Sequence, residues 1–139
     1  MRDLFLNLGL SNKNITIEGF DVSHHGGQNA VASAVRFSSH GPEKNMYRLF
    51  NIPKELSGND IGSMKHVLER RINKASLHPL PDIILIDGGR LQLEAALRTF
   101  STLAKRSPII LSIVKGSKRV RSTETVSYTH LRAHETAYY

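Results

Sequence analysis

The sequence predicts an α/β domain built on a five-stranded mixed sheet, and three observations support this prediction. Alternating segments rich in β-branched residues fill the first part of the chain. Two later segments have apolar residues at helical spacing, and a short, continuous apolar run lies between them. We therefore expect an antiparallel three-strand meander, followed by parallel strands with flanking helices.

The first three strands are separated by turn sequences. Residues 15–23 (ITIEGFDVS) alternate apolar and polar side chains, and residues 30–37 (AVASAVRF) return after a turn that contains Gly26 and Gly27. Residues 46–52 (MYRLFNI) follow a second turn. These segments are expected to form the antiparallel meander.

Two helices are expected in the second half of the chain. Residues 60–75 carry apolar side chains at helical spacing, and either Asn59 or Asp60 is a suitable cap for this helix. Residues 90–104 form a second amphipathic pattern. Each helix precedes an apolar segment, as crossover connections require.

Those apolar segments are the two remaining strands. Residues 83–86 (IILI) form a run of the kind found in central parallel strands that are covered on both faces. Residues 108–114 (PIILSIV) give the fifth strand. Right-handed crossovers leave few topologies open for this order of elements.

Composition narrows the class of protein. The chain has 139 residues and no cysteine, which excludes disulfides and thiolate metal sites and fits a reducing cytoplasm. No apolar run approaches the roughly 20 residues needed to cross a bilayer. Nineteen Lys and Arg residues against twelve Asp and Glu residues give a net charge of +7, which suggests a polyanionic partner such as nucleic acid.

Acidic residues end two of the predicted strands. Asp21 lies near the end of the first strand and Asp87 at the end of the fourth. If these strands are neighbours, the two carboxylates meet at one edge of the sheet. At about 4 Å they would repel by roughly 4 kcal/mol at an effective dielectric of 20, so a shared proton, an arginine or a divalent cation must compensate.

An oxygen-only set of ligands favours Mg²⁺ or Mn²⁺. Asp60 is a candidate third carboxylate, and Gly88 and Gly89 would let a phosphodiester approach the backbone at the following helix N-terminus. The chemistry that fits is metal-assisted phosphodiester hydrolysis, with two cations roughly 3.5–4 Å apart. Each residue also has a simpler interpretation: a turn and helix cap at residues 87–89, an N-cap at Asp60, a turn acid at Asp21, and solvent-exposed turn residues at His24 and His25.

Together, several segments resemble the C-terminal endonuclease domain of the UvrC family, the incision subunit of bacterial UvrABC nucleotide excision repair. The resemblance covers about residues 15–125, and the combination of F-D-V-S-H with L-I-D-G-G is specific. The matching segments are IEGFDVSHHGGQNAVASAVRF, YRLFNI, GNDIGSMKHVLERR, PDIILIDGGRLQLEAA and VKGSKR.

This resemblance implies an RNase H-like fold and a divalent-metal excinuclease of the bacterial cytoplasm, which cuts the damaged strand on the 5′ side of a lesion. The implied partners are damaged DNA and UvrB, which UvrA loads onto DNA. The implied catalytic and metal-binding acids are Asp21, Asp60 and Asp87. The implied DNA-binding residues are Lys115, Lys118, Arg119 and Arg121.

The chain also departs from the family pattern. Asn59 replaces the first acid of an acidic pair, and no "RDE-H-R" helix with the family's catalytic histidine follows the basic segment. The chain is therefore expected to cut DNA poorly or not at all. Residues 1–14 are interpreted as the lead-in from a longer upstream protein, residues 15–125 as the endonuclease domain, and residues 126–139 as a non-native tail that resembles a translated sequencing adaptor.

Two functions remain open at this stage. The first is a metal-dependent endonuclease fragment, and the second is a non-catalytic DNA-binding or protein-docking module on the same fold. A receiver-like domain phosphorylated on a strand-end aspartate is disfavoured, because the opening strands are expected to be antiparallel.

Overall fold

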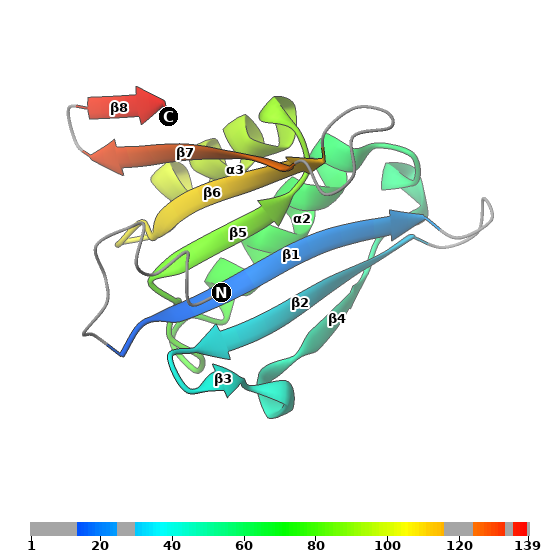
Figure 1. Ribbon diagram of the computed structural model, residues 1–139. Coiled ribbons are helices and arrows are strands. Elements are labelled where there is room, and N and C mark those ends of the chain that lie inside the picture. Colours follow the sequence, from blue (N-terminus) through cyan, green and yellow to red (C-terminus); the bar gives the residue numbers. More distant parts are fainter. Residues whose placement is uncertain (1–13, 25–29, 116–123, 133–134, 139) are drawn as a thin grey trace.

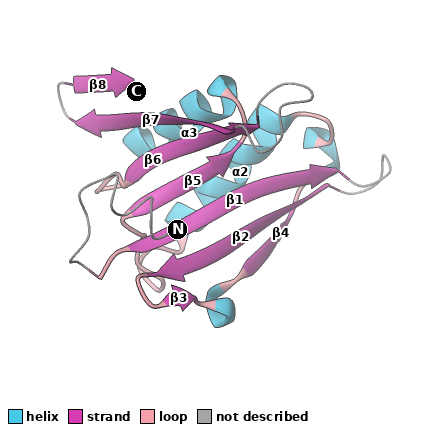
Figure 2. Cartoon of the chain, viewed as in Figure 1, coloured by secondary structure: helices cyan, strands magenta, loops and turns pink. Residues whose placement is uncertain are grey.

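A computed structural model describes residues 14–24, 30–115, 124–132 and 135–138, which form one mixed sheet with two long helices (Figures 1 and 2). In the described ranges, no helix is long and apolar enough to cross a membrane. The elements are β1 (Thr16–His24), β2 (Ala30–Ser38), β3 (Gly41–Pro42), η1 (Lys44–Met46), β4 (Arg48–Asn51), η2 (Lys54–Leu56), α2 (Asp60–Asn73), β5 (Ile83–Asp87), α3 (Arg90–Leu103), β6 (Ile109–Lys115), β7 (Glu124–Arg132) and β8 (Glu135–Tyr138).

The sheet has the predicted mixed topology. Its strand order is β3-β2-β1-β5-β6-β7-β8, and β4 pairs with β2 beside this path. Strands β1, β2 and β4 form the antiparallel meander, whereas β5 runs parallel to both β1 and β6. The meander and the parallel strands are therefore confirmed.

The predicted number of five strands is wrong, because the described residues contain eight. One addition is β3, a two-residue pairing beside β2. The others are β7 and β8, most of which lies within the segment interpreted as a tail. Strand β7 pairs antiparallel with β6 and satisfies backbone groups that an edge strand would leave open. Whether residues 126–139 are native to the domain stays a prediction.

Both helices cover the same face of the sheet (Figure 1). Phe20 of β1 and Ile86 of β5 point toward them and are buried with Met64, Leu68 and Phe100. Alternate side chains of a strand point to opposite faces, so even-numbered residues of β1 and β5 form this core. On the other face, a smaller buried cluster contains Ile15, Ile17, Ile83 and Leu111.

The start of α2 decides between two predicted caps. The side chain of Asn59 accepts a hydrogen bond from the backbone N–H of Gly62 at 2.8 Å, so Asn59 is the N-cap. Asp60 is the first residue of the helix, where a negative charge favours the helix dipole. The interpretation of Asp60 as the N-cap is therefore wrong, and its carboxylate is left to interact elsewhere.

A buried ionic network fastens α2 to the sheet. The carboxylate of Glu18, on β1, accepts hydrogen bonds from Nε and Nη2 of Arg71 at 2.8 Å each, and from Nη1 of Arg36 at 2.6 Å. Arg71 also donates to the backbone carbonyls of His78 and Pro79. The Glu18 side chain is only 6% exposed, so its charge depends on these two partners. The network joins β1, β2, α2 and the connection that leads into β5.

Replacing Glu18 with Gln should lower the free energy of unfolding by about 3 kcal/mol, because a buried guanidinium would lose its counter-charge. Urea unfolding of wild type and variant measures the difference. Glu94→Gln is the matched control, since Glu94 forms only surface i,i+4 pairs with Arg90 and Arg98, and should change stability by about 0.5 kcal/mol or less. Equal effects of the two substitutions would contradict a structural role for the network.

Candidate functional site

The register between β1 and β5 brings two acids together. The parallel pairing runs from Ile17 opposite Ile83 to Phe20 opposite Ile86. Asp21 and Asp87 each come one residue after this last pair, and both line the same depression. Both acids occupy odd positions, so they point away from the face that the helices cover. The condition stated from the sequence is therefore met, because the strands that carry Asp21 and Asp87 are neighbours in the sheet.

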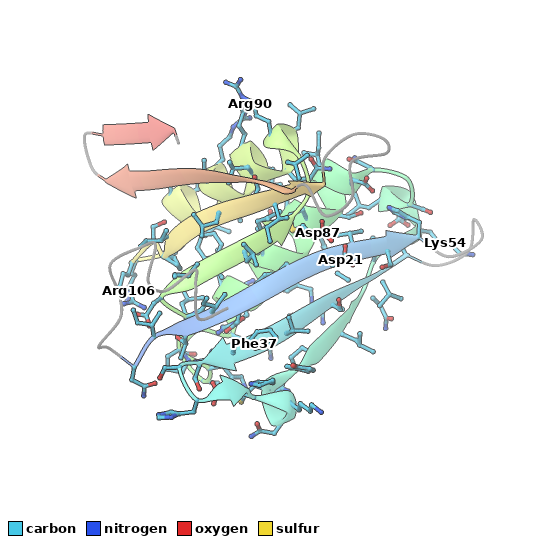
Figure 3. All side chains as sticks on the ribbon, viewed as in Figure 1. Asp21, Phe37, Lys54, Asp87, Arg90 and Arg106 are labelled. Atoms are coloured by element: carbon cyan, nitrogen blue, oxygen red, sulfur yellow. The ribbon has the colours of Figure 1, made fainter. Side chains whose placement is uncertain are left out.

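Asp21 and Asp87 line a depression of about 360 Å³ on this open face. Both residues are exposed, and Figure 3 shows their side chains at the same end of the sheet. Gly19, Ser33, Leu85 and Ile113 also line the depression, together with Phe20 and Val35.

Gly19 keeps part of this depression open. It is two residues before Asp21 on the same face, and a Cβ atom at this position would come within 3.3 Å of the Cγ2 atom of Val35. Sequence reasoning missed Gly19. The signal was a glycine inside a β-branched strand, which marks a close approach by backbone or ligand.

The third predicted acid, Asp60, lies outside the depression and contacts a histidine. Asp60 Oδ1 is 2.6 Å from His24 Nε2, and this contact joins the start of α2 to the end of β1. His24 occupies an even position, on the side of the helices, and Asp60 does not line the depression. In the described ranges, no three His, Asp or Glu side chains form a group able to hold a metal ion. The structure thus brings Asp21 to Asp87 but not Asp60 to either, and a ligand role for Asp60 stays a prediction.

The backbone amides of the two glycines after Asp87 both donate hydrogen bonds within the protein. The N–H of Gly88 donates to the carbonyl of Ile113 at 3.2 Å, and the N–H of Gly89 donates to Oε1 of Gln92 at 3.1 Å. A phosphate that reached the Gly89 amide would have to displace the Gln92 side chain. The predicted approach of a phosphodiester to this backbone stays a prediction.

The predicted DNA-binding segment is described only at its first residue. Lys115 is the last residue of β6, where its backbone lies opposite Glu124. Lys118, Arg119 and Arg121 lie outside the described residues.

The carboxylates of the depression fit a hard divalent cation. Mg²⁺ in proteins commonly takes one or two carboxylates and completes its coordination with water and substrate phosphate oxygens. Asp21 and Asp87 supply two carboxylates from adjacent strands, and the chain has no thiolate that would favour a softer metal. The residues present therefore fit Mg²⁺ or Mn²⁺.

Comparison with known proteins identifies the family of this chain. A family model described as the UvrC RNase H endonuclease domain matches residues 6–138. The chain belongs to this family. Its UvrC domain relatives include the UvrABC system protein C of Klebsiella pneumoniae (strain 342), with 42% identity over 117 residues, and that of Yersinia enterocolitica, with 39% identity over 131 residues.

These matches cover 81% and 91% of this chain but 19% and 21% of the relatives. The chain therefore spans about one fifth of the length of these curated proteins.

Solved structures support the RNase H-like fold. Ciona intestinalis endonuclease V in complex with an inosine-containing DNA gives a TM-score of 0.54 with 16% identity, covering 78% of this chain and 48% of that one. The catalytic domain of human endonuclease V gives a TM-score of 0.52 with 18% identity, covering 76% and 47%. At this level of identity the likeness concerns the fold.

If Asp21 and Asp87 hold one cation, Asp21→Asn and Asp87→Asn should each weaken Mn²⁺ binding at least tenfold, because each would remove one of the two carboxylates of the depression. Asp60→Asn should change it by less than about threefold, because Asp60 is engaged with His24 outside the depression. Electron paramagnetic resonance of free Mn²⁺ during titration measures all three affinities. An Asp60→Asn variant as impaired as the other two would place all three acids in one site.

Proposed function

We propose that this chain is the nuclease part of a nucleotide excision repair incision protein, and that it hydrolyses DNA phosphodiesters with a divalent cation held by Asp21 and Asp87. One observation carries the proposal: the β1–β5 register places both acids in a single depression on the open face of the sheet. Membership of the UvrC RNase H endonuclease domain family supports the same reaction class.

Each part of the depression has a role in this proposal. Asp21 and Asp87 bind the cation from adjacent strands, and Gly19 leaves room between them and the apolar floor. When bound, the cation supplies Lewis-acid activation of water and neutralises charge on the phosphodiester. The exposure of both acids lets a DNA backbone reach them without opening the core.

DNA reaches this site through electrostatic attraction. The chain carries a net charge of +7, and the basic segment KGSKRVR (residues 115–121) begins at the last residue of β6. Strand β6 pairs with β5, which ends in Asp87. Lysine and arginine contacts to phosphates release counterions, so DNA binding should weaken steeply as salt increases. We assign Lys115, Lys118, Arg119 and Arg121 to these contacts.

The choice of strand and the protein partner are proposed for a parent protein with the length of the curated relatives. We propose that the parent cuts the damaged strand on the 5′ side of a lesion, together with UvrB, in the bacterial cytoplasm. The basis is the resemblance of the F-D-V-S-H and L-I-D-G-G segments together with relatives named UvrABC system protein C.

A non-catalytic DNA-binding module is the second candidate. Two observations favour it: Asp60 pairs with His24 rather than with the other acids, and the amides of Gly88 and Gly89 are both engaged. Such a module would bind DNA without cutting it, and its DNA binding would not depend on a cation.

Wild type should nick a supercoiled plasmid slowly in Mn²⁺ and not in EDTA, because the acids need a cation to act. Asp21→Asn/Asp87→Asn should lower the nicking rate at least 100-fold, while DNA affinity, measured by fluorescence anisotropy, should not decrease. Asp82→Asn is a matched control, since Asp82 accepts a hydrogen bond from the N–H of Thr16 and does not line the depression.

Nicking that persists in the double variant would contradict the proposal. An identical response of wild type and double variant to Mn²⁺, with no nicking by either, would favour the non-catalytic module.

A further inference from the structure

A second concave surface lies on the helix-covered side of the sheet, where the C-terminal half of α2 faces β4. This groove has a volume of about 260 Å³ and shares one lining residue, Val35, with the Asp21–Asp87 depression. Nothing in the proposed nuclease reaction uses it. The residues that define the groove are Arg48, Phe50, Arg70, Lys74, Leu77 and His78.

The groove carries excess positive charge. Arg48, Arg70 and Lys74 are exposed, and across the described ranges no carboxylate lies within 4.0 Å of their charged groups. Glu18 also lines the groove, but its charge is balanced by Arg71 and Arg36. Nη1 of Arg48 donates hydrogen bonds to the backbone carbonyls of Asn45 and Tyr47, but these neutral acceptors leave the positive charge of Arg48 uncompensated. The three cations therefore give the groove positive charge that a carboxylate ligand would balance.

Apolar surface accompanies these cations. Leu77 is 72% exposed, and Met46, the last residue of η1, lines the same groove. A ligand that covered the Leu77 side chain would be bound more tightly, because the removal of apolar surface from water lowers the free energy. The combination of cations with an exposed leucine suits a ligand that is both acidic and apolar.

Nucleic acid fits this groove less well than a peptide. Single strands bind to basic channels that also present aromatic faces for stacking by bases. The Phe50 ring is buried, and the guanidinium of Arg70 lies 5.4 Å from its centroid, so this ring is not open to a base. DNA phosphates would engage the cations but leave Leu77 without a partner.

We infer that the groove binds an acidic segment of a partner protein, which places carboxylates against Arg48, Arg70 and Lys74 and one large apolar side chain against Leu77. The surface is distinct from the Asp21–Asp87 depression, because the two share Val35 alone among their lining residues and neither acid lines the groove. Binding of the segment leaves the two acids accessible to DNA.

Fluorescence anisotropy with the 139-residue chain tests this inference. The probes are a short fluorescein-labelled peptide of alternating Glu and Leu, the same peptide with Ser in place of Leu, and a labelled oligothymidine. The Glu–Leu peptide should bind at least tenfold more tightly than the Glu–Ser peptide. Arg70→Gln/Lys74→Gln and Leu77→Ser should each lower the affinity for the Glu–Leu peptide at least fivefold.

Lys65→Gln/Lys105→Gln is the charge-matched control, because neither lysine lines the groove, and it should leave peptide binding unchanged. The variants change exposed side chains, and circular dichroism establishes that each is folded. Equal loss in the control pair, or no effect of Leu77→Ser, would overturn the inference. Selective loss of oligothymidine binding in Arg70→Gln/Lys74→Gln would overturn it in favour of a nucleic-acid site.

Discussion

The parallel register of β1 against β5 is the constraint on which the rest of the structure depends. Phe20 opposite Ile86 fixes the side chains that face the helices, and the next residue of each strand, Asp21 or Asp87, lines the depression on the other face. A slip of one residue would turn an acid toward the buried core, because successive side chains alternate between faces. The same pairing thus determines the core and the site.

The two faces of the sheet have different roles. Packing on the face covered by α2 and α3 stabilises the register between β1 and β5. Phe20, Ile84 and Ile86 are buried under α2 and α3, and the Glu18–Arg71 contacts fasten α2 to the middle of β1. The open face carries the exposed acids and the small residue that leaves room beside them. A ligand can therefore approach the acids without disturbing the packed face.

Much of this arrangement follows from the sequence, because local patterns determine it. The alternation in residues 15–23 and the apolar run before Asp87 predict two strands whose acids meet if the strands are neighbours. The Glu18 network and the His24–Asp60 contact did not follow, since partner choice depends on how α2 approaches the sheet. The sequence did contain one signal for the Glu18 network. Glu18 lies two residues before Phe20 and so faces the same core, where a charge without a partner is destabilising.

The proposed reaction requires that the side chains at positions 21 and 87 bind one ion. The chain has no cysteine, so an Asp21→Cys/Asp87→Cys variant carries only two thiols. Titration of the reduced variant with Cd²⁺, followed by thiolate-to-cadmium ultraviolet absorption, tests the claim directly. Two thiolates on one ion should give about twice the absorption per bound Cd²⁺ of either single-cysteine variant, with at least tenfold tighter binding. Single-thiolate absorption and no gain in affinity would contradict the account.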